Sequence, residues 1–131
     1  MPYIQFQGIR YDFEQLRREP LRVHPAFTFC YHWLNGQDYF VFQTSGSTGT
    51  PKAIEVARSQ MEASIRGTAK VLGLGSRDRA LICLNTDYIG GIMMLARSLQ
   101  LGLNALILPP EGNPLAQVPS NFQPTFIALV P

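Results

Sequence analysis

The chain has 131 residues, and its 11 Lys and Arg against 9 Asp and Glu give a formal net charge of +2. This length fits one domain with a single core, and 46% hydrophobic against 15% charged residues is typical of a globular chain rather than a disordered one. The nearly balanced charge gives no electrostatic reason to expect a nucleic-acid partner. The size leaves room for one binding site, but not for a large two-substrate enzyme.

The chain carries no sequence signal for export or for a membrane. Its start has no basic stretch followed by an apolar one, and no apolar run approaches the roughly 18 residues of a membrane span. Cys30 and Cys83 lie in neither a Cys-x-x-Cys pair nor a metal-ligand spacing. We therefore expect buried free thiols and a cytoplasmic location, rather than a disulfide or a metal site.

The first elements expected along the chain are a short strand and two helices. Residues 3–22 predict a strand and turn, then a polar helix that ends at Pro20. A second helix follows, because four apolar residues recur at helical spacing while His32 and Trp33 fall outside that stripe. The four stripe residues are Phe27, Cys30, Tyr31 and Leu34.

The middle of the chain predicts two strands around a loop and then a helix. Residues 38–43 are rich in aromatic and β-branched side chains, and residues 52–56 are expected to form a short return strand. Ser59 and Glu62 have the spacing of a capping box, so the helix is expected to start at Ser59. Its apolar stripe is Met61, Ile65, Ala69 and Leu72, and Gly73 and Gly75 end it.

The last part of the chain alternates regularly between strand and helix patterns. Strands are expected at residues 80–84, 103–108 and 125–130, with a helix at 90–101 and a loop with one short helical turn at 111–124. The strands are continuous apolar runs, which indicates burial on both faces. The predicted fold is therefore α/β, with a mostly parallel sheet and right-handed strand–helix–strand crossovers.

The segment that carries chemistry is residues 44–52, Thr-Ser-Gly-Ser-Thr-Gly-Thr-Pro-Lys. Glycines let successive backbone amides converge on an anion, hydroxyls add donors, and Lys52 adds a positive charge. These features favour polyphosphate binding over a flexible Gly/Ser linker, because strand patterns flank both sides. The loop is not a Walker A motif, since Pro51-Lys52 stands where that motif requires Gly-Lys.

This loop resembles the signature T-S-G-S-T-G-x-P-K of the adenylate-forming superfamily, which includes acyl- and aryl-CoA ligases, luciferases and peptide-synthetase adenylation domains. The similarity continues through residues 59–78, 84–91 and 126–131, so that it covers roughly residues 38–131. The resemblance implies a partial N-terminal AMP-binding domain. Residues 1–37 are then a lead-in, and residues 38–131 hold the phosphate loop and the βαβ units.

The resemblance implies a two-step reaction. A carboxylate attacks the α-phosphorus of ATP to give an acyl-adenylate and pyrophosphate, and the thiol of coenzyme A then displaces AMP. Mg²⁺ is expected to screen the triphosphate, and no protein metal site is implied. The residues implied to bind the phosphates are Thr44, Ser45, Gly46, Ser47, Thr48, Gly49, Thr50 and Lys52, and those implied to lie on the acyl or CoA side are Tyr88, Gly90 and Gly91.

The chain also departs from the family pattern. Many relatives have a His where this chain has Tyr88, so Tyr88 is either a substrate contact or a packed aromatic residue. Asp87 is unusual beside a carboxylate substrate, and Asn85 and Thr86 are weaker candidates. The adenine-binding aromatic-Gly-x-Thr-Glu motif, the ribose-binding Asp, the Gly-Arg hinge and the catalytic Lys of the C-terminal domain do not occur. We therefore expect this piece to be inactive in adenylation by itself.

Other titratable residues are expected to be structural. His24 and His32 have no nucleophile or metal-like partner at a useful spacing, so both are interpreted as surface or helix-cap residues. Lys70 lies within the predicted third helix and is expected to be solvated.

Within the superfamily, the short segment before the loop is similar to that of the bacterial o-succinylbenzoate–CoA ligases of menaquinone synthesis, so the expected acyl partner is a small carboxylic acid. Two other functions stay open. In the first alternative the chain is a non-catalytic nucleotide- or anion-binding module. In the second it is an assembly domain that associates through its last strand, residues 125–130.

Overall fold

The computed structural model describes residues 1–43, 49–50, 52–110 and 113–128. In chain order the elements are β1 (Tyr3–Phe6), β2 (Ile9–Asp12), α1 (Phe13–Arg18), α2 (Ala26–Leu34), β3 (Tyr39–Gln43), β4 (Ala53–Ala57), α3 (Arg58–Leu72), β5 (Arg79–Ile82), α4 (Ile89–Leu101), β6 (Asn104–Ile107), the 3-10 turn η1 (Pro114–Gln117) and β7 (Phe126–Ile127).

The main sheet has the strand order β2-β1-β6-β5-β7. Strand β6 pairs in parallel with β1 and β5, β5 pairs in parallel with β7, and only β2 runs antiparallel, at the edge. Helix α4 is the crossover between β5 and β6. The predicted α/β fold with a mostly parallel sheet is therefore confirmed. The sequence did not predict that the first strand of the chain would enter this sheet beside β6.

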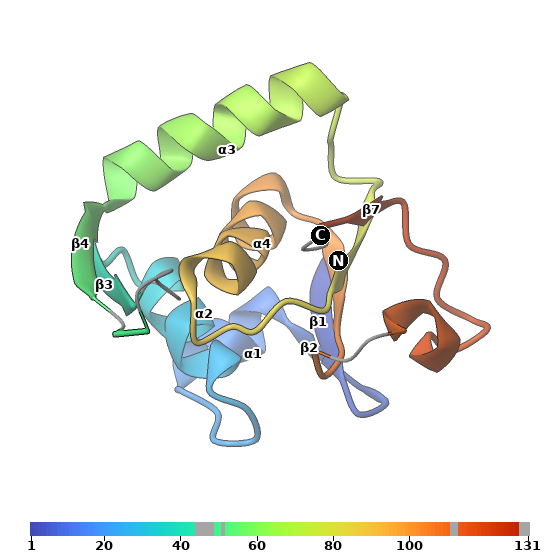
Figure 1. The fold of residues 1–131 in the computed structure, drawn as a ribbon. Helices are drawn as coiled ribbons and strands as arrows, with labels where there is room; N and C mark the ends of the chain where they lie inside the picture. The colour runs from blue at the N-terminus through green and yellow to red at the C-terminus, as the bar shows by residue number, and fades with distance from the viewer. Residues whose placement is uncertain (44–48, 51, 111–112, 129–131) are drawn as a thin grey trace.

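Both faces of the sheet are covered, which explains why its strands are continuous apolar runs. Helices α2 and α4 pack on one face, where Ile82 and Ala105 are fully buried (Figure 1). The segment that contains η1 covers the other face, where Phe122 packs on Leu81 and Leu106.

The β3–β4 hairpin forms a separate two-stranded sheet that packs against α2. The side chains of β3 alternate, with Phe40 and Phe42 buried and the residues between them exposed. The Phe40 ring lies 5.1 Å from Phe29 and 5.8 Å from Trp33, measured between ring centroids. The prediction that Trp33 lies outside the buried stripe is therefore wrong. Trp33 is only 3% exposed, because the hairpin covers that side of the helix.

Helix α3 begins one residue before the predicted start, and its cap differs. The side chain of Gln60 accepts the Ala57 N–H at 3.1 Å, whereas Ser59 is exposed and makes no cap. Glu62 instead faces Arg58, with 3.6 Å between Nε and a carboxylate oxygen. The predicted Ser59–Glu62 capping box is therefore wrong, because the chain enters the helix directly from β4.

The predicted stripe of α3 is buried only in its first half. Met61 and Ile65 are buried, Ala69 is half-buried and Leu72 is 56% exposed. Gly73 ends the helix in the left-handed conformation, with a φ of 67°, as its position predicts.

Cys30 and Cys83 are buried free thiols, as predicted. Burial raises the pKa of Cys30 to about 12, so this thiol is unreactive at neutral pH. Among the described residues no helix is long and apolar enough to cross a membrane, and no group of acidic, His and Cys side chains is arranged to hold a metal ion.

Candidate functional site

The predicted phosphate loop connects the two strands of the β3–β4 hairpin, which are paired up to the point where the loop leaves them. Gln43 closes β3 and is paired across the hairpin with Ala53, the first residue of β4. Five of the implied phosphate-binding residues, Thr44, Ser45, Gly46, Ser47 and Thr48, lie outside the described residues, as does Pro51. Gly49, Thr50 and Lys52 are described, and all three are exposed to solvent.

Gly49 has a φ of 83°, in the left-handed region. A residue with a Cβ is strained there, which gives a physical reason for glycine at this position in the loop. No heavy atom of the described residues lies within 4 Å of the place where a Cβ would stand, so the backbone conformation is the reason that the structure gives for glycine.

The structure brings the base of this loop to the second set of predicted site residues. Gln43 forms a parallel β-bridge with Tyr88, outside the regular strands. Tyr88 is half-buried and is the residue that precedes α4. The end of β3, from which the loop departs, is thus attached to the segment that links β5 to α4.

Gly90 and Gly91 lie in the first turn of α4, and their surroundings differ sharply. A Cβ on Gly91 would stand 2.4 Å from the backbone oxygen of Asn85 and 2.9 Å from the Cα of Thr86. A Cβ on Gly90 would meet only the flexible end of Leu84, at 3.5 Å. Gly91 therefore lets α4 approach the turn that follows β5, and Gly90 does not have that role.

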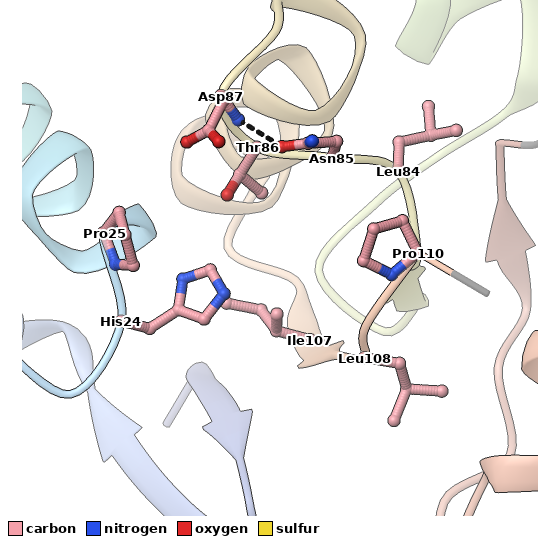
Figure 2. Close-up of a pocket in the computed structure, with 9 residues that line it drawn as sticks. All are labelled: His24, Pro25, Leu84, Asn85, Thr86, Asp87, Ile107, Leu108 and Pro110. Carbon is pink, nitrogen blue, oxygen red and sulfur yellow. Dashed lines mark hydrogen bonds between the residues drawn. The ribbon is translucent and has the colours of Figure 1, made fainter.

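That turn is held by its own hydrogen bonds. The Asn85 side chain accepts the Asp87 N–H at 2.8 Å, and the Asn85 carbonyl accepts the Tyr88 N–H at 3.3 Å. These bonds fix the backbone path from β5 to Tyr88. They also leave Thr86 and Asp87 at the outside of the turn (Figure 2).

A small cavity of about 120 Å³ opens beside this turn, at the carboxyl ends of β5 and β6. His24 from the lead-in forms part of its wall, together with Thr86 and Asp87, and Ile107 and Pro110 lie on the β6 side (Figure 2). In open α/β sheets, ligands bind beyond the carboxyl ends of the strands. The cavity therefore lies at the edge of the sheet where a ligand is expected.

His24 is positioned from two sides. Its Nδ1 accepts the Ala26 N–H at 3.0 Å, and its ring meets the ring of Phe6 edge-on, with 4.8 Å between centroids. Burial lowers the pKa of His24, and the nearby negative charge of Asp87 partly opposes that effect. The neutral imidazole is thus favoured at neutral pH.

From the sequence, His24 is interpreted as a surface or helix-cap residue. In the structure it is half-buried and precedes the N-cap Pro25, but its side chain accepts the N–H of Ala26, the first residue of α2. Sequence reasoning missed that His24 also borders the cavity. No local pattern could have indicated this, since the turn that His24 faces, at Asn85 and Thr86, lies about 60 residues further along the chain. Lys70 is exposed, as expected, in the last turn of α3.

The chain belongs to the AMP-binding enzyme family, whose model matches residues 12–131. The match includes α1, α2 and β3, so it begins well before the loop. Together with the fold, it confirms the resemblance to AMP-forming acyl-CoA synthetases.

Among curated proteins, 2-succinylbenzoate–CoA ligase from Bacillus cytotoxicus is 32% identical to this chain over 69 residues, which cover 53% of the chain and 14% of that protein. Its counterpart from Bacillus mycoides matches to the same extent. An acyl-CoA synthetase (AMP-forming)/AMP-acid ligase II-like protein from Dyadobacter fermentans has a solved structure that superposes with a TM-score of 0.76 and 39% identity, over 89% of this chain and 34% of that one. The chain thus spans only a small part of each of these relatives.

Proposed function

We propose that this chain is the N-terminal part of an ATP-dependent, AMP-forming acid–CoA ligase. The observation that carries the proposal is the bridge between Gln43 and Tyr88. It joins the base of the Gly/Ser/Thr-rich loop to the Tyr88-Ile89-Gly90-Gly91 segment, so the implied phosphate side and acyl side of one reaction lie at adjacent positions.

In the proposed first step, a carboxylate oxygen of the substrate attacks the α-phosphorus of ATP and pyrophosphate leaves. The sequence of the loop between Gln43 and Lys52 supplies amides, hydroxyls and an ammonium group, the kinds of donor that the charge of a pyrophosphate leaving group requires. Lys52 is exposed at the end of the loop. Mg²⁺ neutralises part of the triphosphate charge when it is bound.

In the second step, the thiol of coenzyme A attacks the acyl carbon and AMP leaves. Tyr88, Gly90 and Gly91 are proposed to lie on that side of the site. Gly91 has a positioning role there, because its missing side chain allows α4 to approach the turn at Asn85. We also propose the division into a lead-in, residues 1–37, and the phosphate-loop and βαβ part, residues 38–131.

For the acyl substrate we propose 2-succinylbenzoate, and hence a place in menaquinone synthesis in the cytoplasm. The support is the similarity of a 69-residue stretch, at 32% identity, to 2-succinylbenzoate–CoA ligases. The reading frame that encodes the chain offers a direct test. Continuation into an aromatic-Gly-x-Thr-Glu segment supports the ligase, whereas a stop codon after Pro131 favours a separate anion-binding module.

The phosphate site can be tested on this chain by calorimetric titration with pyrophosphate. Lys52 and Lys70 are its only lysines, and both are exposed, so Lys70→Ala is a matched control for Lys52→Ala. We expect the unaltered chain and Lys70→Ala to bind equally, and Lys52→Ala to bind about tenfold more weakly, which corresponds to a charge-assisted contact of roughly 1.4 kcal/mol. Equal heats from both variants would contradict the phosphate-binding proposal.

A further inference from the structure

The cavity beside the Asn85 turn has a polar side and an apolar side. His24, Thr86 and Asp87 line one side, and Leu84, Ile107 and Pro110 line the other (Figure 2). Its volume is about 120 Å³, well above the roughly 10–15 Å³ that one water molecule needs. The cavity is therefore suited to a small organic group that is apolar at one end and forms hydrogen bonds at the other.

The hydrogen bond at Nδ1 decides what His24 offers to the cavity. Nδ1 accepts the Ala26 N–H at 3.0 Å, so the neutral ring carries its proton on Nε2. No described residue accepts a hydrogen bond from Nε2, and the imidazole ring lies within the cavity wall, where the Thr86 hydroxyl points toward it (Figure 2). The polar side thus presents an N–H donor next to a hydroxyl that donates or accepts.

The charge of the cavity wall determines which kind of ligand the cavity favours. Among the described residues that line the cavity, Asp87 carries a charge, and the neutral form of the His24 imidazole is favoured at neutral pH because burial opposes its protonation. A carboxylate placed there would meet a like charge. A neutral group that both accepts and donates hydrogen bonds matches His24, Thr86 and Asp87, since Asp87 and Thr86 accept while His24 donates.

We propose that this cavity binds the uncharged amide group of a small organic ligand. The amide oxygen accepts from His24 Nε2, the amide N–H donates to Thr86 or Asp87, and the attached alkyl group packs on Ile107 and Pro110. The site is distinct from the phosphate loop, and the proposal does not depend on the ligase activity.

Isobutyramide and isobutyrate test this proposal, because they have the same shape and differ in charge. Each is titrated into the chain at pH 7.5 while the NMR signals of the His24 ring and the Thr86 methyl group are followed. We expect isobutyramide to cause saturable shifts at millimolar concentration, and isobutyrate to bind at least about tenfold more weakly. Equal binding of the two, stronger binding of isobutyrate, or the absence of saturable shifts would overturn the proposal.

Variants locate the binding. His24→Asn keeps an oxygen near the Ala26 N–H but shortens the side chain, so that no donor stands at the place of Nε2. Thr86→Val removes a hydroxyl with little change of shape. Both are expected to weaken isobutyramide binding about threefold to tenfold, the range of one hydrogen bond. His32→Asn changes the chain's other histidine, which lies on α2 and does not line the cavity, so it is the matched control and should bind normally. Unchanged binding by His24→Asn and Thr86→Val would also overturn the proposal.

Discussion

Gln43 and Tyr88 form a parallel β-bridge that ties the last residue of β3 to the residue preceding α4. The β3–β4 hairpin belongs to a separate two-stranded sheet, and this bridge and the packing on α2 help to attach it to the α/β part of the chain. The position of the predicted phosphate loop therefore depends on the backbone path between β5 and α4.

Gly91 lies in close contact with the backbone of that path, and Gly91→Ala tests its role. The added Cβ would stand 2.4 Å from the Asn85 oxygen, so backbone must move. We expect a loss of about 1–3 kcal/mol in the free energy of unfolding, the usual cost of overpacking. Urea denaturation measures it.

Gly90→Ala is the control for this experiment. Its Cβ makes only an ordinary contact at 3.5 Å, and alanine favours the helix over glycine by up to about 1 kcal/mol. We expect it to be neutral or slightly stabilising. If the two variants unfold at the same urea concentration, Gly91 does not govern the approach of α4 to the turn.

Arg58 links the start of α3 to α2. Its guanidinium group lies 4.0 Å from the centre of the Trp33 ring, and Nη1 donates to the Trp33 carbonyl at 2.7 Å. We expect Arg58→Ala to lose about 1–3 kcal/mol in the free energy of unfolding, from the cation–π contact and the charged hydrogen bond together.

Trp33 is the only tryptophan, so its fluorescence reports both unfolding and the loss of the stacked guanidinium group. Arg66→Ala removes an exposed arginine from the same helix and should change stability by less than about 0.5 kcal/mol. An Arg58→Ala variant as stable as Arg66→Ala would show that the stack on Trp33 contributes nothing.

Thr125 and Asp78 connect the start of β7 to the start of β5. The Thr125 hydroxyl donates to Asp78 at 2.8 Å and accepts the Arg79 N–H at 2.8 Å. Thr125→Val removes both bonds, and we expect a loss of about 0.5–1.5 kcal/mol by chemical denaturation, since the site is open to water. Thr125→Ser keeps the hydroxyl and should keep most of the stability. Thr28→Val, at an exposed position on α2, is the control. Equal losses of stability from both valine variants would mean that the two hydrogen bonds of the Thr125 hydroxyl do not stabilise the fold.

Much of the fold could be predicted because local patterns and tertiary structure agree. The runs at β5 and β6 are buried on both faces, and Gly73 and Gly102 end their helices in the left-handed conformation. The sequence patterns gave wrong predictions where an element distant in the sequence determines the burial or the hydrogen bonds of a residue. Trp33 is buried because the hairpin covers it, and α3 takes its cap from Gln60 because β4 runs straight into the helix.

The candidate site likewise has one part that the sequence predicts and one part that it does not. Glycine at positions 49 and 91 is a local signal, and the structure gives a conformational reason for the first and a steric reason for the second. The cavity was not predictable, because His24 and Thr86 belong to segments that only the sheet topology brings together. A histidine that caps one helix gives no sequence signal about the turn it faces.

His24 should also make the stability of the chain depend on pH. Burial lowers its folded pKa below the ordinary value of 6.5, so the unfolded chain binds the proton more readily. The stabilisation is therefore fully present above pH 6.5, declines as the pH falls below that value, and is lost once the pH passes the folded pKa. Protonation at Nδ1 would also break the bond from the Ala26 N–H. The charge of Asp87 favours the protonated ring and so reduces the effect.

Urea denaturation between pH 8 and pH 5.5 measures this dependence in a range above the titration of ordinary carboxylates. We expect the unaltered chain and His32→Asn to lose stability together as the pH falls. His24→Asn should be less stable than both at pH 8 but show a flatter profile, because the group that titrates is gone. A profile for His24→Asn as steep as that of His32→Asn would assign the pH dependence to other groups, and the neutral imidazole required by the amide-binding cavity would lose its support.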